Sequence, residues 1–165
     1  VLRVLGRILG GRDAELHDLL HEVFVQALKG IHQVSDGARL KAWLTSVAVF
    51  TARGAIRKRQ RMRWLGFRAP EAMPDLPTAT ADAEVLHALR RTYAVLDQLS
   101  ADLRIPFTLR HIDKMELTEV AEACGVSLAT IKRRISRAER RFVMFARRDS
   151  SLADWVEAHP RWRTL

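Results

Sequence analysis

The 165-residue chain contains a single cysteine, Cys124, so it offers no partner for an intramolecular disulfide, and a reducing cytoplasm is the expected compartment. No apolar run approaches the roughly 20 residues of a membrane-spanning helix, so no membrane insertion is expected. The opening VLRVLGRILGGRD is too charged and too short for a secretion signal, and a start at Val1 suggests that an N-terminal piece is missing. Strand-like alternation and internal repeats are also absent. The apolar period is helical throughout, which predicts an all-α fold.

Acidic residues are scarce relative to basic ones. The chain has 28 Lys and Arg against 19 Asp and Glu, a formal net charge of +9 at pH 7. This balance favours a polyanionic partner through phosphate contacts and counterion release, and nucleic acid is the first candidate.

Proline is rare except in one segment. Three of the five prolines lie in residues 66–82, GFRAPEAMPDLPTATAD, which has no apolar period and is expected to cross solvent as a flexible linker. The prediction is therefore two small helical domains, residues 1–65 and 83–148, followed by a C-terminal tail, residues 149–165.

Residues 117–142, LTEVAEACGVSLATIKRRISRAERRF, have the pattern of two short helices joined by a tight turn. Gly125 suits the left-handed residue that ends a helix, Val126 can fill the corner, and Ser127 can cap the next helix. Each helix has an apolar stripe, and the second keeps six cations outside it: Lys132, Arg133, Arg134, Arg137, Arg140 and Arg141. An ordinary solvated face is the plainer interpretation. The complete turn signature favours a DNA-reading helix-turn-helix in the second domain.

The first domain is predicted to contain two longer helices. One covers about residues 14–30 and is expected to turn these apolar side chains inward: Leu16, Leu19, Leu20, Val23, Phe24, Ala27 and Leu28. The other covers roughly residues 39–61, turns Leu40, Trp43, Leu44, Val47 and Ala48 inward, with Ile56 as a further candidate, and ends in the basic run RKRQRMR. Capping and solubility are the plainer roles for that run, because cations complement the C-terminal end of a helix.

These motifs together resemble the extracytoplasmic-function sigma factors, the smallest members of the main bacterial sigma family. The resemblance is carried by DLLHEVF at 18–24, LKAWLTSVA at 40–48, the basic run at 57–59 and the helix-turn-helix, in this order across a proline-rich linker. It covers nearly everything from Val1 to about Arg148. The first helix of the family's opening domain is expected to be missing.

The resemblance implies three sets of site residues. The helix that docks on the coiled coil of the polymerase β′ subunit would use Asp18, Leu19, His21, Glu22 and Phe24, with His21 where the family usually has Gln. Capture and opening of the minus-ten promoter element would use Arg39, Lys41, Trp43, Arg53, Arg57 and Lys58. Recognition of the minus-thirty-five element would use Ser127, Thr130, Lys132, Arg133, Arg134 and Arg137. Trp43 could instead belong to the core.

The implied partners are core RNA polymerase, through its β′ coiled coil and β flap, promoter DNA and an anti-sigma factor. Phe50 and Gly54 stand where the family commonly has Asn and Asp, and we hypothesise that Phe50 replaces a polar contact with packing. Because of these changes, one alternative function remains: a helix-turn-helix regulator that is derived from a sigma factor and no longer opens promoters. An RNA-binding or scaffold protein is a further alternative with the same charge.

The sequence does not favour an enzyme, and no cofactor or metal is expected. His17 and His21 lie one helical turn apart but lack a third ligand, and Cys124 is expected to be buried filler rather than a nucleophile. Glu116 and Glu119 are interpreted as N-terminal helix charges. In the tail, Ser150 or Ser151 is expected to cap a short helix, and the two tryptophans are expected to pack on the protein itself or on a partner.

Overall fold

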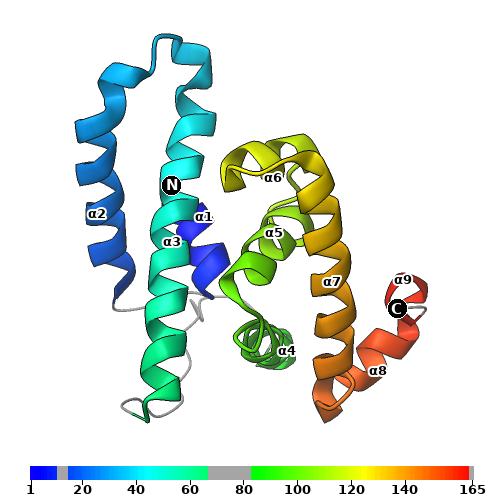
Figure 1. Ribbon diagram of the computed structural model, residues 1–165. Coiled ribbons are helices and arrows are strands. Elements are labelled where there is room, and N and C mark those ends of the chain that lie inside the picture. The colour runs from blue at the N-terminus through cyan, green and yellow to red at the C-terminus, as the bar shows by residue number, and fades with distance from the viewer. Residues whose placement is uncertain (11–14, 67–82, 164–165) are drawn as a thin grey trace.

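The computed structural model describes residues 1–10, 15–66 and 83–163 (Figure 1). All regular structure within these ranges is helical, which confirms the predicted all-α class. The predicted linker lies outside the described residues except for Gly66.

The first half consists of α1 (Leu2–Leu9), α2 (Glu15–Gly30) and α3 (Leu40–Trp64), with the short turns η1 (Ile31–Gln33) and η2 (Gly37–Arg39) between the last two helices. The α2 and α3 helices form a hairpin along one edge of the molecule (Figure 1). Asp36 caps the short turn η2 that leads into α3, because its carboxylate accepts a 2.9 Å hydrogen bond from the Ala38 N–H. Both long helices lie close to their predicted bounds.

The predicted inward stripe of α2 is only partly correct. Leu16, Val23 and Ala27 are buried, but Phe24 and Leu28 are 49% and 74% exposed. The physical reason is geometric: α2 packs on α3 and α1 along one side only, and a stripe built from successive steps of three and four is too wide for that contact. Phe24 and Leu28 therefore face away from the fold.

The second half consists of α4 (Ala83–Leu96), α5 (Ala101–His111), α6 (Leu117–Cys124) and α7 (Leu128–Ala146). The predicted stripe of the helix-turn-helix is confirmed at its central positions, where these side chains are buried: Val120, Ala121, Cys124, Ile131, Ile135, Ala138 and Phe142. Val126, in the turn, packs against the cluster that contains Val120, Cys124 and Ile131.

One hydrophobic core is shared between the two halves. Val49 and Ile56 of α3 belong to the same cluster as Ile105 of α5 and Val120 of α6. A buried polar side chain also crosses the contact, because the Arg104 Nε donates a 2.8 Å hydrogen bond to the carbonyl of Ile8 near the end of α1. The halves therefore pack closely in this structure, while the division into independent domains stays a prediction.

The tail forms α8 (Ser150–Ala158) and α9 (Pro160–Arg163), which pack on the second half (Figure 1). The cap of α8 is Asp149 rather than the predicted Ser150 or Ser151, because its carboxylate accepts from the Ser151 N–H and is held by Arg91. Trp162 is 9% exposed beside Phe107 and Phe142, which confirms its predicted packing. Trp155 remains 41% exposed.

Candidate nucleic-acid interface

The turn between α6 and α7 has the geometry that its residues predict. Gly125 ends α6 in the left-handed conformation at φ 66°, and the Ser127 hydroxyl accepts a 3.3 Å hydrogen bond from the Thr130 N–H. Glu116 and Glu119 form a capping box at the start of α6, in which Glu119 accepts a 2.7 Å hydrogen bond from the Glu116 N–H. The two glutamates therefore have the structural role predicted for them.

The α7 helix presents its cations on one side and its apolar stripe on the other. Lys132, Arg133 and Arg137 are exposed, whereas Arg134 is partly buried and lies 3.8 Å from the carboxylate of Asp102. Thr130 is also partly buried, and its hydroxyl lies 3.0 Å from that of Ser127. The structure thus brings the six residues assigned to the minus-thirty-five element onto the first half of one helix and its cap.

The residues assigned to the minus-ten element follow α3 from its first turn to beyond its middle. Arg39, Lys41, Arg57 and Lys58 are exposed, and Arg53 is partly buried. Trp43 is partly buried, close enough to Gly30 that a Cβ atom added there would lie 3.0 Å from its ring. This contact supports the alternative in which Trp43 packs within the hairpin.

An exposed stripe on α3 includes three residues that sequence reasoning did not assign to DNA. Phe50, Gly54, Arg57, Lys58 and Arg61 are all exposed and recur at helical spacing. Phe50 is 64% exposed, so it does not pack within the fold, and the hypothesis that it replaces a polar base or backbone contact with packing stays a prediction. The spacing in the sequence could have identified this stripe, since positions 50, 54, 57 and 61 lie on one face of a helix.

Three of the predicted minus-ten cations contact the second half of the chain. Arg53 donates a 3.2 Å hydrogen bond to the Cys124 carbonyl, and Arg39 lies 3.7 Å from Glu122. Asp102, at the start of α5, lies 3.1 Å from Arg57 and 3.6 Å from Arg53. Because Arg134 approaches the same carboxylate, Asp102 connects the cationic side of α3 with that of α7.

The residues assigned to polymerase binding lie on α2, at the edge of the molecule (Figure 1). Asp18, His21, Glu22 and Phe24 are exposed, whereas Leu19 is partly buried against the core. Sequence reasoning missed the continuation of this surface, because it placed Leu28 inward. We call these five exposed residues at steps of four, three, four and three the α2 stripe: His17, His21, Phe24, Leu28 and Ile31.

The one cysteine of the chain, Cys124, lies in surroundings that do not favour reactivity. Cys124 is 5% exposed, and burial raises the pKa of its thiol from 9.0 to about 11, which opposes formation of the nucleophilic thiolate. Among the residues that the structure describes, no group of three or more His, Cys, Asp or Glu could hold a metal ion. Within the same ranges, every helix is too short or too polar to cross a bilayer.

Family models match both halves of the chain. The model for sigma-70 region 2 matches residues 1–62, and the model for sigma-70 region 4 matches residues 89–142. The chain belongs to the sigma-70 family. The matches place α1 to α3 in region 2 and the helix-turn-helix in region 4.

Curated relatives narrow this to the extracytoplasmic-function (ECF) group. The chain is 32% identical over 129 residues to the ECF RNA polymerase sigma factor SigX of Bacillus subtilis, covering 72% of this chain and 63% of SigX. It is 29% identical over 138 residues to EcfG of Rhodopseudomonas palustris, covering 83% of this chain and 74% of EcfG. The chain therefore spans somewhat less than two thirds of SigX and about three quarters of EcfG.

A solved structure supports the same assignment. The fold matches the sigma factor RpoE of Bartonella quintana, solved in complex with the anti-sigma factor NepR, with a TM-score of 0.66 and 25% identity. The match covers 90% of this chain and 91% of RpoE. The two folds are thus similar over nearly the whole length of both chains.

Proposed function

We propose that the chain is a sigma factor that directs core RNA polymerase to specific promoters in the bacterial cytoplasm, with no catalysis of its own. The observation that carries the proposal is the presence, on one chain of this family, of a cationic helix-turn-helix and of a separate exposed face on the α2–α3 hairpin. A simple DNA-binding regulator needs only the first of these.

The helix-turn-helix is proposed to read the minus-thirty-five element. In this motif the second helix enters the major groove with its N-terminal residues toward the base edges. Lys132 and Arg133 are exposed near that end of α7, and Arg134 and Arg137 follow in the next turn, where they can bind phosphates. Ser127 and Thr130 lie at the cap, close to where the DNA backbone would approach.

The exposed side of α3 is proposed to bind the minus-ten element as it opens. Arg39, Lys41, Arg57 and Lys58 would hold the separated backbones, and Arg53 would join them when its present contacts are released. Exposed Phe50 supplies an aromatic face on which an unpaired base can stack, and Trp43 would support the hairpin from beneath.

The α2 stripe is proposed to dock on the β′ coiled coil of core polymerase. Helix-mediated docking places anchors at intervals of three and four residues, as the stripe does, and Asp18 and Glu22 provide an acidic border. Contact with the β flap is proposed for the second half. An anti-sigma factor, which the RpoE structure contains, would compete for these same surfaces.

Promoter binding requires the two halves to separate. Elements centred about 10 and 35 base pairs upstream of the start site are roughly 85 Å apart along B-DNA. Arg57 and Arg134 approach a single carboxylate here, at 3.1 and 3.8 Å. The packed arrangement cannot contact both elements at once, so it corresponds to a resting form.

The test is run-off transcription with purified core polymerase and a library of genomic DNA fragments. We expect addition of the protein to create a small set of defined start sites that share two upstream elements. Failure to create any start site, together with failure of core polymerase to retain the protein at moderate ionic strength, would refute the proposal.

A further inference from the structure

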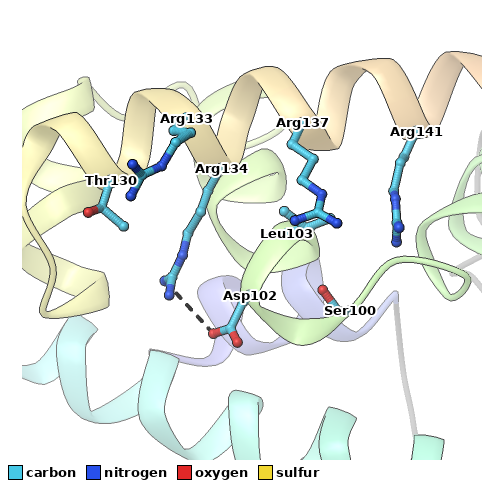
Figure 2. Close-up of a pocket in the computed structure, with 8 residues that line it drawn as sticks. All are labelled: Ser100, Asp102, Leu103, Thr130, Arg133, Arg134, Arg137 and Arg141. Carbon is cyan, nitrogen blue, oxygen red and sulfur yellow. Dashed lines mark ion pairs between the residues drawn. The ribbon is translucent and has the colours of Figure 1, made fainter.

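A cavity of about 410 Å³ lies between the start of α5 and the middle of α7. Its size falls within the range of small-molecule sites, about 300–1,000 Å³. Figure 2 shows Arg134, Arg137 and Arg141 reaching from α7 toward the α5 side, with Arg133 beside Thr130. The cavity is lined by Ser100, Asp102, Leu103, Thr130, Arg133, Arg134, Arg137 and Arg141.

The cavity has more positive charge than its own acidic residue can balance. Among the described residues, Asp102 supplies the only lining carboxylate, and it already faces Arg134 as well as Arg53 and Arg57 of α3. Within the described part of the chain, Arg133, Arg137 and Arg141 have no acidic partner. Guanidinium groups gathered on one cavity repel one another, so a bound anion would lower the free energy of this arrangement.

Neutral donors add to the anionic preference. The Ser100 hydroxyl borders the cavity and makes no capping hydrogen bond in α5. The N–H groups of Ala101 and Asp102, in the first turn of this 11-residue helix, have no acceptor within the helix. Together with the arginines they offer both charge and fixed hydrogen-bond donors to phosphate oxygens.

We propose that this cavity binds a short polyphosphate chain, either free or as the phosphate tail of a nucleotide. Several guanidinium groups spread along α7 suit a ligand with several phosphates better than a single phosphate. The described residues of the lining include no aromatic side chain, so recognition depends on the phosphates. The site itself is independent of the proposed function. Only its consequence rests on that function: the ligand would occupy Arg133, Arg134 and Arg137 and so exclude the minus-thirty-five duplex.

Arg141 and Arg140 give a matched pair of variants for the test. Both are exposed on α7, but Arg141 lines the cavity, whereas Arg140 donates to the Ser136 hydroxyl and does not. Titration calorimetry at about 0.15 M ionic strength would compare inorganic tripolyphosphate, ATP and adenosine. We expect the two phosphate ligands to bind and adenosine not to bind. Arg141→Gln should weaken tripolyphosphate binding about tenfold, and Arg140→Gln less than twofold.

Equal affinity for tripolyphosphate and ATP would assign the site to the phosphate chain, and a tenfold preference for ATP would assign it to a nucleotide. No heat of binding at millimolar tripolyphosphate would overturn the proposal. Equal weakening by Arg140→Gln and Arg141→Gln would also overturn it, since this is the signature of diffuse surface charge. Unchanged helix content and unfolding temperature serve as the folding control. Tripolyphosphate binding without promoter binding would retain the site and reject the proposed function.

Discussion

At the scale of single residues, Asp102 has an unusual number of cationic neighbours. Its carboxylate lies within 4 Å of Arg53, Arg57 and Arg134, which come from two helices proposed to bind different parts of a promoter. The side chain is 38% exposed, so solvent weakens each pair. If α3 and α7 bind DNA as proposed, its larger effect is to place a negative charge where a DNA phosphate would otherwise approach.

Asp102→Asn is expected to raise the affinity for a duplex containing the minus-thirty-five element about threefold to tenfold, because the substitution frees Arg134 and removes repulsion toward phosphate. Fluorescence anisotropy at about 0.15 M salt would measure the change. Asp154→Asn is the matched control, since exposed Asp154 lies on α8 and its substitution changes the net charge equally. An equal gain in both variants would contradict a role specific to Asp102.

Cys124 provides a prediction about pH. Because burial raises its pKa from 9.0 to about 11, the folded protein keeps the thiol protonated where the unfolded chain loses the proton. Stability from this difference is fully present below pH 9 and is lost as pH rises toward 11, by roughly 2–3 kcal/mol. Urea unfolding should therefore show a steeper loss of stability above pH 9 in the native protein than in Cys124→Ala. Parallel pH profiles would contradict this assignment, and comparison with the variant removes the contribution of Tyr93, whose pKa burial also raises.

At the scale of elements, α2 has two apolar faces with different roles. Val23 and Ala27 are buried against the hairpin, whereas Phe24 and Leu28 extend the exposed α2 stripe. A helix at the edge of a small fold has room for only one packed side, so exposed apolar residues at regular spacing mark a surface for a partner. The acidic residues beside the stripe keep this surface amphipathic.

Leu28→Asp is expected to lower the affinity for core polymerase at least tenfold without unfolding the protein, because Leu28 is 74% exposed and makes little contact with the core. Leu65→Asp introduces the same charge at an exposed leucine beyond the end of α3 and should bind normally. Co-purification with core polymerase at several salt concentrations is the measurement. Loss of binding in both variants would indicate a charge effect rather than an anchor.

The helix-turn-helix could be predicted from sequence nearly residue by residue, because its signals are local. Gly125 must adopt a positive φ angle and Ser127 must cap α7, and both constraints concern neighbouring residues only. The exposure of Leu28 and Phe50 could not be predicted in this way. Whether an apolar residue is covered depends on which helices pack nearby, and periodicity identifies a face without saying what lies against it. The cavity at Asp102 could not be predicted from the sequence for the same reason, since its lining residues come from separate helices.

At the scale of the whole molecule, the packed halves and the proposed promoter geometry require a large rearrangement. Hydrogen bonds cross between them: Arg104, which is 2% exposed, donates to the Ile8 carbonyl, and Tyr93 donates to the Arg7 carbonyl. Separating the halves would expose these groups together with part of the shared core. Polymerase and DNA must offset that cost, so each alone should open the protein less than both together.

Distance measurements would detect this opening. Fluorescent labels at Lys29→Cys and Asp154→Cys, in a Cys124→Ala background, occupy exposed positions on α2 and α8. We expect energy transfer to be lower in the complex of core polymerase with promoter than in the free protein, since the label separation should increase by tens of ångströms. A transcriptionally active complex with unchanged transfer would contradict the resting-form interpretation.

Gly10 connects the residue scale with this rearrangement. It has a φ angle of 93° at the end of α1, and a Cβ atom added there would lie 2.7 Å from the Tyr93 ring on the opposite half. Any larger residue would strain the backbone and push against Tyr93 at the same time. A single substitution at Gly10, far from the surfaces proposed for DNA and polymerase, would thus change how much polymerase and DNA is required before the two halves separate. This gives evolution a means of setting the threshold of the response without changing which promoters are recognised.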